Sequence, residues 1–192
     1  YGSYPHPAVA WMFYERAQKN RDLGKLREAE NDCHQALQLL ESEKSTSHFV
    51  QAPMVSAWYE LSFTYRALGE YPLAIDAGQH SLALASAMEA PPWIQRAHQA
   101  MAEVYSDLGD LRSAEEHLQE AIRQPHPFFN ASPLQMAELH LNFTLYEEAL
   151  RDLESVEPAM KAYLELRPWQ RTRWWWPTQK YRLLTYLYLR LG

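Results

Sequence analysis

The chain has 192 residues, 47% of them hydrophobic and 22% charged, which is the composition of a folded domain and excludes a disordered one. No run of about 18 apolar residues occurs, so we expect no membrane-spanning helix, and we expect a cytoplasmic protein. The single cysteine, Cys33, excludes an internal disulfide and a zinc site built from cysteines.

The formal charge of −6 is unevenly distributed along the chain. From Arg167 to the last residue there are six Lys and Arg and no Asp or Glu, so the residues before Arg167 carry a net charge of −12. Nucleic acids are held by Lys and Arg that cluster over a whole face. An acidic body is a poor surface for a polyanion, and we therefore expect no nucleic-acid partner.

Apolar residues recur at spacings of three and four along most of the chain, which predicts helices, and no segment has the alternation of a strand. In chain order, the clearest helical stretches are 58–68, 74–87, 94–108, 113–122, 135–143 and 147–166. Glycines separate them at short turns, and prolines separate them at longer joints.

Three stretches of the sequence align on a glycine and form an internal repeat. Their glycines are Gly24, Gly69 and Gly109, which lie 45 and 40 residues apart, and an alanine follows each glycine five residues later. A weaker fourth copy has Thr144 in place of the glycine, and a fifth begins at Tyr181 and reaches the last residue.

These positions resemble the tetratricopeptide repeat, in which a helix with a Leu, a small residue and a Tyr precedes a turn glycine. The second copy matches it at Trp58, Leu61, Ser62, Tyr65, Gly69, Tyr71 and Ala74. The resemblance implies an all-α fold, a right-handed superhelical solenoid of antiparallel helix hairpins. A period of about 40 exceeds the usual 34 or so of the family and is similar to longer repeats in bacterial regulators.

The predicted domain is a single solenoid over 1–192 with about four and a half repeats. Their approximate bounds are 7–45, 52–88, 92–124, 133–165 and a truncated copy at 177–192. Because the fifth copy stops at its turn, we expect the chain to be a fragment of a larger protein. Self-association through the truncated helix is a further expectation.

In the family, the first helix of each hairpin lines a concave groove that binds a partner. Carried onto this sequence, the groove residues are Trp11, Tyr14, Tyr59, Phe63, Arg66, Arg96, Arg182, Tyr186 and Arg190, with Glu103, Glu138 and Leu141 at equivalent offsets. Rings and guanidinium groups supply concentrated contact energy. The groove is therefore expected to bind an extended or helical peptide with apolar anchors and some acidic character.

A basic and aromatic run between the fourth and fifth copies has three interpretations. Its residues are Arg171, Arg173, Trp174, Trp175 and Trp176. They pack into the joint between helices, form a second contact surface for a partner, or contact a nucleic acid or an anionic membrane.

Signals of catalysis or metal binding are weak. The eight histidines are scattered, none forms an i, i+4 pair, and Cys33 falls at a position expected in the core. We therefore predict no catalytic residue, no metal and no cofactor. The predicted function is that of a non-catalytic scaffold that binds a protein, a peptide or an adjoining domain. The alternative is a sensory or regulatory segment of a larger bacterial signalling protein or transcription regulator with an output domain beyond residue 192.

Overall fold

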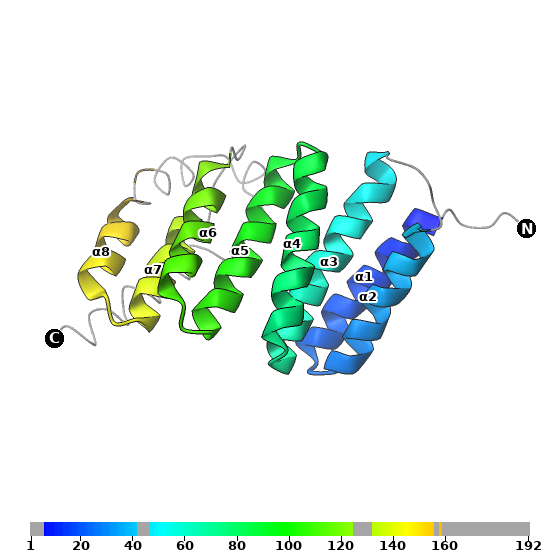
Figure 1. Cartoon of the computed structure of the whole chain (residues 1–192), viewed down its shortest axis with the longest axis horizontal. Coiled ribbons are helices and arrows are strands. Elements are labelled where there is room, and N and C mark those ends of the chain that lie inside the picture. Colours follow the sequence, from blue (N-terminus) through cyan, green and yellow to red (C-terminus); the bar gives the residue numbers. More distant parts are fainter. Residues whose placement is uncertain (1–5, 42–46, 125–131, 156–157, 159–192) are drawn as a thin grey trace, which may run out of the picture.

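The computed structural model describes residues 6–41, 47–124, 132–155 and 158, and in these ranges it contains eight α-helices and no strand (Figure 1). The helices are α1 (His6–Asp22), α2 (Leu26–Glu41), α3 (His48–Leu68), α4 (Tyr71–Ala87), α5 (Pro91–Asp107), α6 (Leu111–Arg123), α7 (Ser132–Asn142) and α8 (Tyr146–Ser155). They pair into four hairpins. The all-α solenoid predicted from the sequence is confirmed.

The four hairpins stand side by side along the long axis of the molecule, from α1 and α2 at one end to α7 and α8 at the other (Figure 1). Each helix packs against the next one in the chain. The first helices of neighbouring hairpins also meet, α1 with α3 and α3 with α5. The first helices α1, α3, α5 and α7 therefore line one surface, which we call the inner face. The outer layer consists of α2, α4, α6 and α8.

The turn inside each hairpin has the same backbone geometry. The φ angles are 74° at Gly24, 77° at Gly69 and 76° at Gly109, and Thr144 in the fourth turn has φ 61°. In all four, this residue donates its N–H to the carbonyl three residues back, and the next residue donates to the carbonyl five back. The fourth copy thus keeps the left-handed turn with a β-branched residue, for which that conformation is strained.

Small side chains bring the two helices of a hairpin close together. Ser62 on α3 and Ala74 on α4 are both fully buried, and Ser62 Oγ donates to the carbonyl oxygen of Ala74 at 2.8 Å. Ala102 and Ala114 hold the equivalent places in the third hairpin, with 3% and 0% of their surface exposed. The small residues of the repeat pattern therefore lie at the helix interfaces, and Cys33 is buried in the core as expected.

Several predicted features lie outside the described residues. They are the truncated repeat at 177–192, the end of the fourth repeat from 159 on, Arg171, Arg173, Trp174, Trp175 and Trp176, and the groove positions Arg182, Tyr186 and Arg190. These stay predictions. No helix in the part of the chain that the structure describes has the length and apolar character needed to cross a membrane.

Two histidines that are far apart in the sequence meet between α5 and α6. His98 Nδ1 and His117 Nδ1 are 2.9 Å apart, and the ring of Tyr105 stacks on His117 with centroids 5.4 Å apart. Burial and the neighbouring His117 lower the pKa of His98 to about 4, and burial lowers that of His117 although Glu116 and Glu120 oppose the shift. The pair is therefore held in its neutral form.

Replacing Thr144 with glycine should stabilise the fourth hairpin. The Thr144 side chain is exposed, so its loss removes no contact, whereas a left-handed backbone costs a side-chain-bearing residue about 1 kcal/mol. In Thr144→Gly, amide hydrogen exchange in α7 and α8 should slow by a factor of about five.

The matched control is Gly109→Thr in the preceding turn, where an added Cβ would meet nothing within 4 Å. Because only the backbone conformation is at issue there, this variant should speed exchange in α5 and α6. Unchanged exchange in both variants would show that the left-handed turn does not limit the stability of these hairpins.

The histidine pair predicts a loss of stability in mild acid. The pKa of His98 is lower in the folded state than its ordinary 6.5, so the unfolded chain binds more protons, and stability falls as pH drops from 6.5 towards about 4. His98→Gln should flatten this slope in chemical denaturation. The exposed His48, at the start of α3, provides the control His48→Gln, which should leave the slope unchanged; equal slopes in wild type and His98→Gln would contradict the prediction.

Candidate functional site

An aromatic cluster occupies the inner face where α1 and α3 pack together. Trp11 and Tyr14 on α1 have ring centroids 5.3 Å apart, and Tyr59 and Phe63 on α3 meet edge to face at 4.9 Å. The members of each pair are three or four residues apart, so the helix itself holds the rings on one side. Trp11 is 37% exposed and Tyr14 only 7%, so the cluster has a buried base and an accessible rim.

An ion pair with a buried carboxylate joins α1 to α3 next to Phe63 of this cluster. Glu60 on α3 is fully buried, and its Oε1 accepts a hydrogen bond from Arg21 Nε on α1. Burial raises the pKa of Glu60, and the guanidinium of Arg21 opposes that rise. Arg21 also lies over the Phe63 ring, 5.5 Å from its centroid. Arg21 thus ties α1 to α3 and packs on the Phe63 ring.

Arg96 brings a cation from α5 towards the same cluster. Its side chain is exposed and lies 5.0 Å from the centroid of Trp93. Burial raises the pKa of Tyr14 and of Tyr59, and Arg96 is close enough to oppose both shifts. The predicted groove residues Trp11, Tyr14, Tyr59, Phe63 and Arg96 are therefore neighbours across three helices. We call this group the aromatic cluster.

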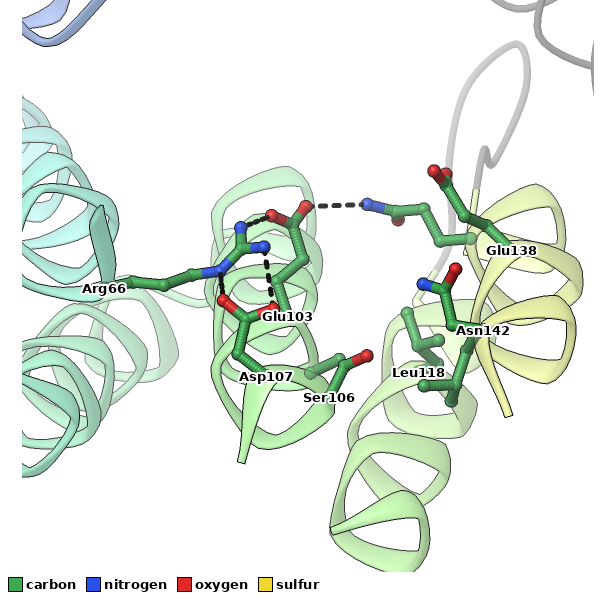
Figure 2. A pocket seen from close by; sticks show the side chains of 10 residues that line it. Arg66, Glu103, Ser106, Asp107, Leu118, Glu138 and Asn142 are labelled. Carbon is green, nitrogen blue, oxygen red and sulfur yellow. Dashed lines mark hydrogen bonds and ion pairs between the residues drawn. The ribbon is translucent and has the colours of Figure 1, made fainter. Parts of the chain in front are cut away.

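Arg66 lies further along the inner face and is engaged by two carboxylates of α5. Its Nε donates to Asp107 Oδ2 at 2.6 Å and its Nη2 to Asp107 Oδ1 at 3.2 Å, while Nη1 donates to Glu103 Oε2 (Figure 2). This bidentate and bridging geometry fixes α5 against α3. Arg66 is on the predicted face, but its charge is already neutralised within the protein.

A pocket of about 280 Å³ opens beside this ion-pair network, between α5 and α7. Figure 2 shows Glu103, Ser106 and Asp107 on α5 facing Glu138 and Asn142 on α7 across it. The lining residues are Arg66, Ala102, Glu103, Ser106, Asp107, Leu118, Gln135, Glu138, Leu139 and Asn142. We call it the α5–α7 pocket. Of the sequence-predicted offsets, Glu103 and Glu138 reach it, whereas Leu141 is buried with 5% exposure.

Burial is the largest cause of a raised pKa at Glu103. The guanidinium of Arg66 opposes the shift, and the carboxylates of Glu138 and Asp107 add to it. Three acidic groups therefore compete for one cation at this place. The sequence indicated Glu103 and Glu138 only as exposed groove positions, and Asp107, Gln135 and Asn142 were missed, although 135, 138, 139 and 142 form one stripe of a helix.

Other polar clusters in the described ranges hold helices together. His140 is 7% exposed and lies between Asp152 Oδ2 at 2.6 Å and Glu115 Oε1 at 2.8 Å, so it links α7 to both α8 and α6. Over residues 6–41, 47–124 and 132–155, no group of three or more His, Cys, Asp and Glu is arranged to hold a metal ion.

Comparison with known proteins identifies the repeat. Residues 53–124, which cover most of α3 and the whole of α4 to α6, match the family model described as tetratricopeptide repeat. A search of curated proteins gives no significant match. Proteins built from this repeat are in general protein-interaction scaffolds.

Solved structures extend the likeness to most of the chain. The apo form of RapI is 15% identical with a TM-score of 0.66 over 81% of this chain and 44% of its own. BtubC (BKLC) from P. vanneervenii is 15% identical with a TM-score of 0.74 over 97% and 74%. A Podosopora anserina protein with nearly identical TPR-like repeats, assigned to the kinesin light chains, is 22% identical with a TM-score of 0.64 over 86% and 80%.

At these identities the likeness shows the fold alone, and the chain spans less than half the length of RapI. The match at 53–124, the repeated left-handed turns and the small residues between paired helices nevertheless agree with one another. The segment 53–124 thus matches the tetratricopeptide repeat family, and the hairpins on either side share its turn geometry.

Proposed function

We propose that the inner face binds an extended or helical segment of a protein partner. The observation that carries this proposal is the aromatic cluster, in which side chains of α1, α3 and α5 gather on one accessible surface. Trp, Tyr and Arg are the residue types that contribute most at protein interfaces. Rings with a buried base and an exposed rim lose little conformational entropy when a partner covers them.

The packing around the cluster supports a preformed surface. Two sets of ion pairs hold α1, α3 and α5 in fixed relative positions. Arg21 and Glu60 join α1 to α3, and Arg66 joins α3 to α5. A surface that is already ordered binds without the cost of folding a loop. The cluster acts by contact, and we propose no reaction for it.

The partner segment belongs either to a separate protein or to an adjoining domain of a longer chain. The second case corresponds to a regulatory segment of a larger signalling protein, in which an output domain would lie against the inner face. Both cases require the same contacts from the aromatic cluster. The same variants therefore test both.

Selection of short random peptides displayed on phage tests the proposal. Peptides that bind the wild type are synthesised, and their affinities are measured by fluorescence anisotropy. Trp11→Ala and Arg96→Gln should each weaken binding about tenfold, because each removes an exposed contact of the cluster. Neither side chain is buried, so both variants should keep the wild-type circular dichroism spectrum.

Matched changes on the outer layer serve as controls. Leu73→Ala on α4 removes an apolar side chain that is 47% exposed, and Arg112→Gln on α6 removes a cation with 88% of its side chain exposed. These two variants should bind like the wild type. Recovery of no binding peptide, or equal affinity in the inner-face and outer-layer variants, would refute the proposal.

A further inference from the structure

The α5–α7 pocket interrupts the packing of first helices along the inner face. α1 packs on α3 and α3 on α5, but between α5 and α7 there is an opening of about 280 Å³. Its floor is apolar, made of Ala102, Leu118 and Leu139, which are 3%, 3% and 4% exposed. The opening is of a size for one side chain rather than for a large ligand.

The polar rim of the pocket carries an excess of negative charge. Glu103, Asp107 and Glu138 contribute three carboxylates, and Arg66 contributes the one guanidinium among the lining residues. Both carboxylates of α5 already share Arg66, as Figure 2 shows. Glu138 forms no hydrogen bond or ion pair with any residue that the structure describes, and it lies near enough to raise the pKa of Glu103.

A second observation points to a missing hydrogen-bond donor. Gln135 lines the pocket, and its Oε1 is shielded from solvent and has no donor within the described chain. Gln135 Nε2 reaches Glu103 Oε1 only at 3.5 Å. An acceptor oxygen buried without a donor costs about 1–3 kcal/mol. The unsatisfied groups of the pocket are thus acceptors, and the charge that it lacks is positive.

We propose that the α5–α7 pocket binds one lysine or arginine side chain of the partner segment. The aliphatic stem lies on the floor formed by Ala102, Leu118 and Leu139, and the cationic head donates to Glu103, Glu138 and Gln135 Oε1. Lysine and arginine are donors only, and their stems are apolar, so they fit both halves of the pocket. This inference rests on the proposed function and names the chemistry of one anchor of the partner.

An acidic side chain does not fit the same place. It would be within a low-dielectric pocket beside three carboxylates whose one cation is already shared, and like charges juxtaposed at an interface cost several kcal/mol. A neutral side chain could cover the floor but would leave the acceptors unpaired. The pocket therefore discriminates by charge.

The test uses three pools of capped peptides that are identical except at their central position. The flanking positions are random mixtures of uncharged residues, and the centre is lysine, norleucine or glutamate. Norleucine keeps the length of the lysine stem without its charge. By isothermal titration calorimetry at low salt, the wild type should bind the lysine pool about tenfold more tightly than the norleucine pool, and the glutamate pool most weakly.

Variants at Glu138 assign that preference to the pocket. Glu138→Gln should reduce the preference for lysine over norleucine severalfold, and Glu138→Lys should abolish it, because the new cation would occupy the site beside Glu103. Glu138 makes no side-chain bond within the described residues, so both variants should fold, which thermal melting verifies. Glu28→Gln on the outer layer makes the same charge change as Glu138→Gln at an exposed position and should leave the preference intact.

The outcomes separate the inference from the proposed function. If all three pools bind with equal affinity, the inner face binds peptides but the pocket does not select a cation, and the inference is overturned. If no pool binds, the proposed function fails and the inference falls with it. If lysine is preferred equally by wild type, Glu138→Gln and Glu138→Lys, another site makes the selection and the inference is wrong.

Discussion

The close approach of the two helices in each hairpin is the constraint on which the rest of the structure depends. Where α3 meets α4, Ser62 and Ala74 leave no bulk between the backbones, and a hydroxyl-to-carbonyl bond of 2.8 Å spans the gap. A larger side chain at either position would push the hairpin open, because a close-packed core does not absorb added volume. The fixed spacing of each hairpin then sets the spacing of the first helices, and so the layout of the inner face.

The inner face has two chemically different ends. Towards α1 lie the rings of the aromatic cluster, of which Phe63 packs on Arg21 of the Arg21 and Glu60 pair. Towards α7 the surface is polar and acidic around the α5–α7 pocket. Arg66 lies at the boundary between them. Its guanidinium is paired with Glu103 and Asp107 of α5, so it presents no unpaired positive charge to a ligand. A segment that follows the inner face would meet apolar contacts at one end and a cation-selective contact at the other.

Most of the fold could be predicted from the sequence because it is encoded locally. The turn glycines, the alanines five residues after them and the Leu61, Ser62 and Tyr65 pattern all act within one hairpin, where sequence spacing and spatial spacing coincide. Even Thr144, which breaks the glycine rule, keeps the turn because the flanking helices pack on each other and hold it. The hairpin of the weak fourth copy could therefore be predicted from the sequence despite the substitution of its glycine.

The charges of the site could not be predicted in the same way, because pairing between hairpins follows the stacking rather than the repeat. Arg66 and its partners Glu103 and Asp107 are 37 and 41 residues apart, and no spacing rule identifies them as neighbours. A cation counted from the sequence suggests attraction for an acidic ligand, but a guanidinium held by two carboxylates presents little net charge to a ligand. The local balance of charge therefore decides what the α5–α7 pocket attracts, and with three carboxylates around one guanidinium that balance is negative.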